Sequence, residues 1–260
     1  MCGRLGAGLR FLASAAVPVL EVLFPPRCVG CGDFEWYLCP SCRESLQPVG
    51  EDSCPRCGSP GPVAVLGGRC SDCMGEELSF VSARAAFLHQ GAAARLVAEF
   101  KFGGQVVLGR VMAELAAPTF AAFLGSLPEA ERTVVTWVPS HPHTRRVRGY
   151  NQAEVLAKVL AAGHGPLATA PLLKKTRRTR QQKELDRAAR RENLRGVFAM
   201  NEGWKERVPA SAGALLLVDD VFTTGATVQE ASSVLSSASG LPVYVFTFCR
   251  AVGGGSERHD

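Results

Sequence analysis

The chain has 260 residues, of which 47% are hydrophobic, and a formal net charge of +5. This length and apolar content suffice for a sizeable core and exclude a disordered chain. The first apolar stretch, residues 11–24, is interrupted by Pro18 and Glu21 and is shorter than the roughly 20 residues that span a bilayer. No A-x-A cleavage site follows it, so we interpret residues 1–23 as an N-terminal apolar segment and expect no transmembrane segment.

Eight of the ten cysteines form four C-x-x-C pairs. Each pair has the spacing of a zinc knuckle, and two pairs complete one tetrahedral structural site that holds shape and does no chemistry. Four tandem pairs without a surrounding βαβ pattern favour metal binding over a redox or disulfide role. We expect two Zn²⁺ sites in a double zinc ribbon at 24–78, with consecutive pairs sharing an ion, although a cross-braced arrangement has the same spacing. The expected ligands are Cys28, Cys31, Cys39, Cys42, Cys54, Cys57, Cys70 and Cys73.

From residue 80 onward the pattern is an alternation of strands and helices. Apolar runs predict strands at 83–88, 134–139, 215–219 and 243–250, and helical periodicity predicts helices at 92–102, 106–124, 151–162 and 223–238. Strands that are apolar throughout and separated by helices indicate a parallel sheet covered on both faces. We therefore predict an α/β domain at 79–252, followed by a flexible tail at 253–260.

The segment LLLVDDVFTTGAT, residues 215–227, is the strongest functional signal. Asp219 and Asp220 are expected at the carboxyl end of a central strand, where ligands bind in sheets of this kind. The turn that follows leads into a helix, so free backbone N–H groups and hydroxyls meet the positive end of a helix dipole and can hold a phosphate. A carboxylate pair beside a phosphate cradle points to a phosphorylated sugar. The predicted cradle consists of Thr223, Thr224, Gly225, Ala226 and Thr227.

This segment closely resembles the phosphoribosyl pyrophosphate (PRPP) motif of type I phosphoribosyltransferases. The resemblance implies the parallel sheet of that fold, with Asp219 and Asp220 as the catalytic pair that holds the ribose 2′ and 3′ hydroxyls and residues 223–227 around the 5′-phosphate. It also implies Mg²⁺ bound with the pyrophosphate. In such a reaction the positive charge that develops at C1′ is stabilised electrostatically, without a covalent protein nucleophile.

Further segments narrow the family. The knuckles after FPPRC, EFKFGG around Lys101, and the stretches at 138–157 and 179–198 are together similar to the ComF family of competence proteins (ComFC/GntX-like), from about Phe24 to Arg250. The family implies a role in DNA uptake during natural competence or in DNA processing, with PRPP, single-stranded DNA and competence or DNA-processing proteins as candidate partners. Cationic groups suit pyrophosphate. The candidates for this contact are Lys101, Arg145, Arg148 and Arg190. The resemblance in the two stretches falls on Arg145, Arg148, Gly149, Tyr150, Asn151, Gln152, Thr179, Gln182, Leu185, Arg190, Asn193 and Phe198.

One position departs from the purine-recycling phosphoribosyltransferases, in which an aspartate that serves the base stands at the place of Thr223. A threonine cannot accept a proton near neutral pH, which argues against purine salvage. Two hypotheses of different class remain. The protein is either a phosphoribosyltransferase that transfers a pentosyl group to an unidentified acceptor, or a catalytically inactive nucleic-acid-binding or protein-binding accessory module that retains the fold.

Positive charge is concentrated in residues 174–195, which contain ten Lys and Arg against three Asp and Glu. Three interpretations stay open: a solvated helix or loop, a flap that closes over PRPP, and a surface that tracks a nucleic-acid backbone. Thiolates that must stay reduced for zinc point to the cytoplasm. The apolar start of the chain could dock on a membrane surface or a partner.

Overall fold

The computed structural model describes residues 25–62, 66–177 and 193–251. The chain divides into two compact units, residues 1–45 and 46–260. This division falls between the second and third C-x-x-C pairs, so the last two pairs belong to the larger unit. The expected boundary between a zinc ribbon and an α/β domain at 78/79 stays a prediction, and the segments 1–23 and 253–260 lie outside the described residues.

In residues 25–45, the part of the smaller unit that the structure describes, α2 (Pro40–Glu44) is the one helix. Its first knuckle turns back on itself through a bridge between Arg27 and Phe34, and the Arg27 guanidinium lies 3.9 Å from the centre of the Phe34 ring. The side chain of Cys39 caps α2 at the position where the helix begins. The second C-x-x-C pair, Cys39 and Cys42, therefore lies at the start of a short helix.

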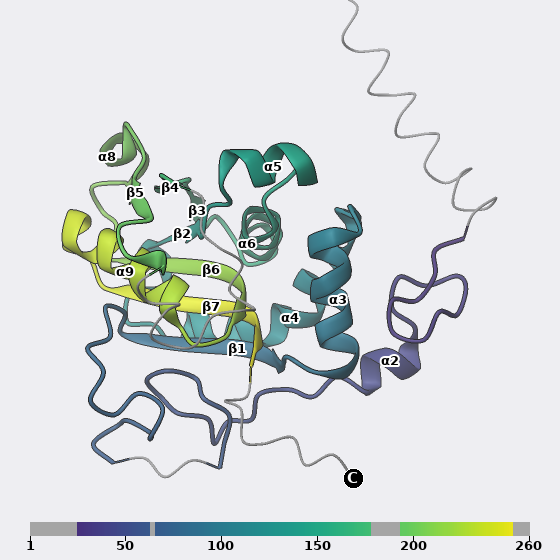
Figure 1. The fold of residues 1–260 in the computed structure, drawn as a ribbon. Coiled ribbons are helices and arrows are strands. Elements are labelled where there is room, and N and C mark those ends of the chain that lie inside the picture. The colour runs from purple at the N-terminus through teal and green to yellow at the C-terminus, as the bar shows by residue number, and fades with distance from the viewer. Residues whose placement is uncertain (1–24, 63–65, 178–192, 252–260) are drawn as a thin grey trace, which may run out of the picture. The chain divides into compact units, whose positions relative to one another are not determined.

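Five parallel strands form the central sheet of the larger unit. They are β1 (Ser82–Leu88), β2 (Thr133–Trp137), β3 (Ala168–Thr169), β6 (Ala214–Phe222) and β7 (Val243–Arg250), in the order β1-β7-β6-β2-β3 (Figure 1). Every residue of β2 and β7 is buried, which explains why these strands read as unbroken apolar runs. The predicted parallel α/β sheet is confirmed.

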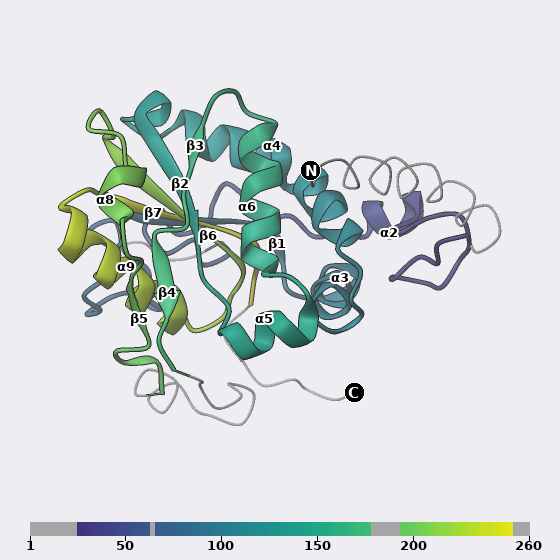
Figure 2. The same cartoon turned by 90° about the horizontal axis from the view of Figure 1, so that it is seen from above.

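Helices cover both faces of this sheet. The pair α3 (Gly91–Phe102) and α4 (Val107–Gly125) leads from β1 to β2, α6 (Gln152–Ala162) leads from β2 to β3, and α9 (Ala226–Ser239) leads from β6 back to β7. Crossovers between parallel strands are right-handed. Two connections that step along the sheet in opposite directions therefore place their helices on opposite faces. Hence α9 lies on one face and α4 and α6 lie on the other (Figure 2). The connection from β2 leads to one edge of the sheet and the connection from β6 leads toward the other. Ligands bind where the connections diverge in this way, so the expected crevice lies at the carboxyl ends of β6 and β2.

Helix α4 is long and apolar enough to cross a membrane by length and composition, alone among the helices within the described ranges, and half of its apolar window is buried. Its buried residues include Leu108, Met112 and Phe120, and the Phe120 ring packs edge-on against Phe246 of β7. These contacts are those of a core helix of an α/β protein.

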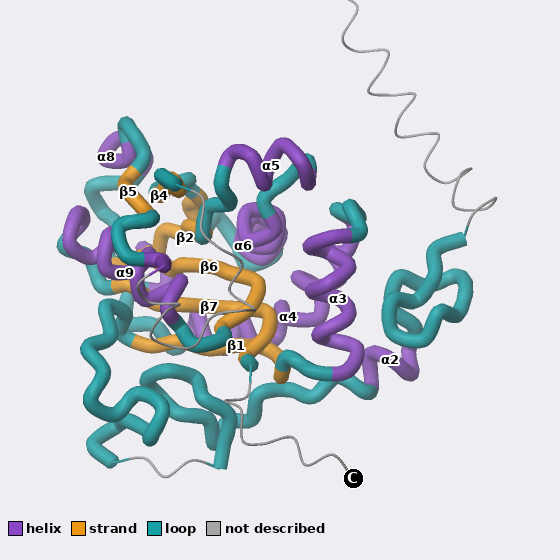
Figure 3. Tube along the Cα trace, viewed as in Figure 1, coloured by secondary structure: helices purple, strands orange, loops and turns teal. Residues whose placement is uncertain are grey.

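Several short elements were not predicted. They are α5 (Pro142–Arg148), α8 (Trp204–Arg207), a 3-10 turn (Ala130–Arg132), and an antiparallel ribbon of β4 (Leu173–Lys175) and β5 (Phe198–Met200). Each is too short or too polar to show periodicity. By contrast, residues 46–81 contain neither helix nor named strand where the structure describes them (Figure 3).

Strand β6 is longer than predicted. Its pairing with β7 continues to Phe222, which lies opposite Arg250. Asp219 and Asp220 were expected where the strand ends, but they lie inside its last four residues. Their backbone is therefore fixed by the sheet, and the turn into α9 begins only at Thr223.

Candidate functional site

The two groups of cysteines have the geometry of metal centres. Within each group the sulfur atoms all lie within 4.8 Å of one another, and the groups consist of consecutive C-x-x-C pairs. Sulfur separations of 3.6 Å (Cys31 to Cys39, and Cys57 to Cys70) and 3.8 Å (Cys54 to Cys73) match the ~3.8 Å edge of a tetrahedron with zinc–sulfur bonds of about 2.3 Å. These separations are too long for disulfides. The chain thus has two four-cysteine clusters that fit structural zinc, with consecutive and not cross-braced pairing.

In the first cluster, backbone groups are arranged for a thiolate. The Cys28 sulfur accepts hydrogen bonds from the N–H groups of Gly30 and Cys39, both at 3.3 Å. Burial alone would raise the pKa of Cys28, but these N–H groups and that of Cys31 lower it to about 6. A Cβ at Gly30 would lie 2.4 Å from the Cys42 sulfur, so this knuckle needs a glycine.

The second cluster is attached to the edge of the sheet. The backbone N–H of Ala83 in β1 donates to the carbonyl of Arg56 at 3.0 Å, and a Cβ at Gly58 would lie 2.7 Å from the Ala83 carbonyl. All four thiols are buried. Because β1 is an edge strand, this knuckle pairs backbone groups that would otherwise be open to another chain. The second cluster is thus part of the packed structure of the larger unit.

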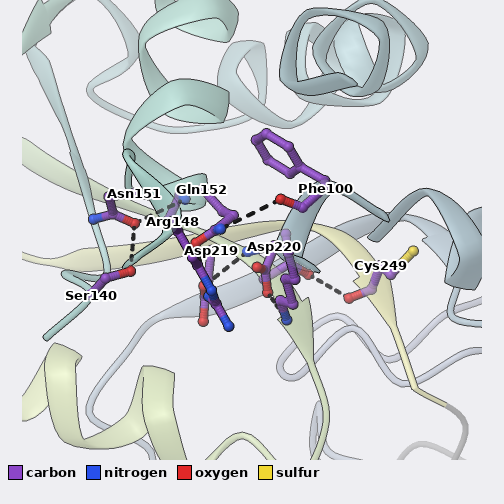
Figure 4. A network of polar contacts seen from close by, with 11 residues as sticks. Phe100, Ser140, Arg148, Asn151, Gln152, Asp219, Asp220 and Cys249 are labelled. Atoms are coloured by element: carbon purple, nitrogen blue, oxygen red, sulfur yellow. Dashed lines mark hydrogen bonds and ion pairs between the residues drawn. The ribbon is translucent and has the colours of Figure 1, made fainter. Parts of the chain in front are cut away.

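The two acids of β6 face different partners. Neighbouring residues of a strand project to opposite faces, so Asp219 and Asp220 meet different neighbours near the carboxyl end of β6. The Lys101 Nζ at the end of α3 forms an ion pair with Asp220 Oδ1 at 2.7 Å. The Asp219 Oδ1 accepts the backbone N–H of Asp220 at 2.9 Å (Figure 4). Burial, together with the Asp220 charge, raises the pKa of Asp219 to about 7, while Lys101 and Lys175 act in the opposite direction.

The loop after β6 contains the five residues that are predicted to hold a phosphate. Gly225 has a φ of +81° and caps α9, and a Cβ there would lie 2.7 Å from the Phe222 ring. A substitution at this glycine is therefore excluded both by its backbone conformation and by space. Thr223 is exposed and Thr224 and Thr227 are half-buried, at the N-terminus of a 14-residue helix. The five predicted cradle residues are brought together.

The RGYNQ segment, residues 148–152, connects α5 and α6 and makes several hydrogen bonds to the neighbouring elements. Asn151 donates to the Val138 carbonyl at 3.1 Å and accepts from Ser140 and from the Ala153 N–H, so it fixes the loop after β2 and begins α6. The Tyr150 hydroxyl donates to the Phe100 carbonyl at 2.5 Å. These residues support the site, whereas sequence reasoning gave them no role.

Arg148 is the member of this segment that lies near Lys101. Its Nη1 donates to Gln152 Oε1 at 3.2 Å, and its charge opposes protonation of Lys101, the partner of Asp220 (Figure 4). Lys101 and Arg148 also line one cavity of about 310 Å³ with Phe102, Gly104, His143, Thr144 and Val147. Two of the predicted cationic residues therefore line one cavity, and one of them, Lys101, pairs with Asp220.

Of the other two cationic candidates, one lies elsewhere and one is outside the described residues. Arg145 is mostly exposed and forms an ion pair with Glu154 of α6 at 3.6 Å, and it does not line that cavity. Arg190 lies outside the described residues. A residue without an assigned role, Lys175 in β4, is instead close enough to Asp219 for the two charges to shift each other's pKa. The sequence could not single out Lys175, because it is one of ten Lys and Arg in residues 174–195. Its position near Asp219 is apparent only in the folded structure, where it lies in the ribbon of β4 and β5.

We predict that Lys101→Met destabilises the fold as well as weakening anion binding. The change leaves Asp220, whose side chain is only 10% exposed, without its cationic partner. Loss of one partner of such a pair should lower the free energy of unfolding by about 2 kcal/mol, measured by urea denaturation. Arg145→Met is the matched control, since its ion pair is exposed and should contribute at most about 0.5 kcal/mol. Equal losses in both variants would contradict the buried pair.

Comparisons with known proteins agree with this architecture. The double zinc ribbon domain family matches residues 19–74. Competence protein ComFC of Streptococcus pneumoniae is 30% identical over 82% of this chain and 87% of its own length. DNA utilization protein YhgH of Salmonella typhi is 26% identical over 84% and 92%, and competence protein F of Haemophilus influenzae is 28% identical over 82% and 90%.

The match to the Streptococcus pneumoniae protein extends well beyond the zinc ribbon, because it covers 216 residues of this chain. Both parts expected from the sequence, two four-cysteine clusters and a five-stranded parallel sheet flanked by helices, are present in the structure. The chain belongs to the ComF family of competence and DNA utilization proteins.

Proposed function

We propose that the protein binds PRPP with Mg²⁺ at the carboxyl end of β6 and uses it in DNA uptake or DNA processing. The observation that supports this proposal is the position of the two acids, which lie shortly before the 223–227 cradle, where the connections between strands change direction. In it, Asp219 and Asp220 accept the ribose hydroxyls, and the backbone N–H groups at the start of α9 hold the 5′-phosphate.

The remaining charges suit the pyrophosphate. Lys101 and Arg148 would bind its oxygens from the side of α3 and α5, while Lys175 stands on the side of Asp219. Carboxylate oxygens are also ligands that Mg²⁺ accepts, and the ion would neutralise charge on the leaving pyrophosphate. The chain's own groups thus bind, orient and neutralise, which is what a displacement at C1′ needs.

Titration calorimetry with PRPP and MgCl₂ tests this proposal. We expect saturable binding at one site per chain. PRPP binding would be refuted if titration with PRPP released no heat and ribose 5-phosphate did not compete with PRPP for the protein. Release of pyrophosphate on addition of a candidate acceptor would then identify the protein as a phosphoribosyltransferase, whereas binding without release across acceptor classes would favour an accessory module that senses PRPP.

Binding of single-stranded DNA is a second candidate function, favoured by the charge of 174–195 and by the DNA utilization proteins among the relatives. Residues 178–192 of this segment lie outside the described structure. If the contacts are to phosphates, the affinity should fall steeply as salt rises. DNA affinity that is insensitive to salt would contradict this proposal. Cytoplasmic localisation, where thiolates stay reduced, is proposed with it.

We predict that PRPP binding strengthens as pH rises through about 7. The pKa of Asp219 is raised to about 7 by burial and by Asp220, and its protonated form cannot accept a ribose hydroxyl as strongly. Below that pKa the affinity should fall by about tenfold per pH unit. Calorimetry between about pH 6 and pH 8 measures this change.

Lys175→Met serves as the matched variant for this pH profile. The Lys175 charge lowers the pKa of Asp219, so its removal should move the midpoint to higher pH. The phosphates of PRPP titrate equally in both proteins and do not affect the difference. A flat profile in the wild type, or an unchanged midpoint in the variant, would contradict the role of Asp219.

A further inference from the structure

A second cavity connects the second cysteine cluster with the phosphate cradle, both within the larger unit. It has a volume of about 270 Å³. Cys57 and Cys73 lie in one wall, and Thr224, Gly225 and Ala226 lie in another. The resemblance to phosphoribosyltransferases assigns the cradle to PRPP and the cluster to structure, and it gives no reason for the two to share a cavity.

Arg250 lines the same cavity. It ends β7, its side chain is 5% exposed, and its Nε and Nη1 are buried without a hydrogen-bond partner among the described residues. Its guanidinium carbon lies 3.8 Å from the centre of the Phe222 ring. A buried cation without a counter-charge is costly, so a nearby negative group is needed.

The zinc-loaded cluster supplies most of that negative charge, and the Asp72 carboxylate, which lines the same cavity, adds to it. Four thiolates and one Zn²⁺ carry a net charge of −2, and no carboxylate forms an ion pair with Arg250 in the described part of the chain. Burial lowers the pKa of Arg250, and the negative charges of Cys57, Asp72, Cys70 and Cys54 oppose this effect. Arg84 is near the same cluster and donates to the Cys54 carbonyl at 2.9 Å. Two arginines therefore balance the charge of one metal centre.

Only one of these arginines reaches the cradle. The Phe222 ring, over which Arg250 lies, occupies the space where a Cβ of Gly225 would be. Gln229 in the second turn of α9 also bonds to the segment that follows Cys73: its amide donates to the Glu77 carbonyl at 2.8 Å and accepts the Ser79 N–H at 3.0 Å. The start of α9 is thus held from the side of the second cluster at two places.

We propose that Arg250 is a positioning residue that couples the second metal centre to the phosphate cradle. The charge of the zinc-loaded cluster holds the guanidinium over Phe222, and Phe222 holds Gly225 in the conformation that directs the N–H groups of α9 at the ligand. Loss of zinc from this centre would then loosen the cradle although no metal contacts the ligand. The ligand part of this inference rests on the proposed PRPP site, and the conformational part does not.

The test compares Arg250→Met with Arg84→Met, two losses of one buried positive charge beside the same cluster. Both variants should release zinc to a chelator faster than the wild type by about tenfold, the low end of losses for groups that support metal ligands. In Arg250→Met alone, amide hydrogen exchange of residues 223–229 should accelerate and PRPP affinity should fall by about tenfold. Arg250→Lys, which keeps the charge, should restore slow exchange and most of the affinity.

The outcomes separate coupling from a merely structural role. Equal acceleration of exchange at 223–229 in both arginine variants, or none in Arg250→Met, would overturn the proposal. So would failure of Arg250→Lys to slow exchange relative to Arg250→Met. If the wild type does not bind PRPP, the proposed function fails, but hydrogen exchange and zinc release still decide whether Arg250 couples the two sites.

Discussion

The double variant Asp219→Asn/Asp220→Asn should lose PRPP affinity by at least about 100-fold. Hydrogen bonds to a charged group contribute about 1.5–3 kcal/mol each, and both ribose hydroxyls would lose their charged acceptor and face an amide that also presents N–H donors. Two bonds at the low end of this range already amount to about 3 kcal/mol, or about two orders of magnitude in Kd. Calorimetry with PRPP and MgCl₂, at the pH where the wild type binds best, measures the loss.

The single variants show that this loss does not come from unfolding. The pKa of Asp219 is raised in the folded protein, so its stability contribution is lost as pH rises from the unfolded value toward about 7. Asp219→Asn removes a charge that costs folding energy and should raise the urea midpoint at about pH 8. Asp220→Asn breaks the pair with Lys101 and should lower it.

If Asp219→Asn raises the urea midpoint, Asp220→Asn lowers it, and both variants bind PRPP more weakly, the weaker binding cannot come from unfolding. Both acids would then be ligand-binding residues. A double variant that binds PRPP as tightly as the wild type would refute the site. If Asp219→Asn instead lowered the midpoint, the assignment of a raised pKa to Asp219 would be wrong, while the binding data would still decide whether the acids hold the ribose.

The fold was predictable because its main elements are buried in regular ways. Strand β7 is buried along its whole length and reads as the unbroken run VYVFTFCR, and α3 buries Leu96, Val97 and Phe100 on one face. Burial in α6 is less regular: Leu156 and Leu160 are buried, but Val155 and Val159 are half-buried, and the small residues Ala153, Ala157 and Ala161 are buried in their place. Periodicity reports burial, so it detects the elements that the core needs.

The site was predictable in its cradle and acids but not in its supports. Residues 219–227 are contiguous, so one local motif shows them all. Lys101 and Asp220 lie far apart in the sequence and meet only because α3 ends beside β6. Arg250 shows the same limit more strongly, since a basic residue at the end of an apolar strand carries no sign that its side chain is buried between Phe222 and a cysteine cluster.

The two zinc centres should differ sharply in what their loss does to the larger unit. Cys70→Ser removes a fully buried ligand from the cluster that pairs with β1 and bonds to α9. Structural zinc contributes about 10–16 kcal/mol of apparent binding energy in isolated fingers. Even partial loss should therefore lower the free energy of unfolding of the sheet by at least about 3 kcal/mol.

Cys31→Ser is the matched variant in the other cluster, where the thiol is exposed and belongs to the separate unit 1–45. Metal analysis should find about one zinc per chain in each variant, against two in the wild type. Circular dichroism of the helices follows unfolding of the larger unit, because the smaller unit has only the five-residue α2 where it is described. An unfolding midpoint that falls in Cys70→Ser and stays unchanged in Cys31→Ser would show that the second ribbon is a structural part of the sheet domain. Equal shifts in both would instead mean that the two zinc centres fold as one with the sheet.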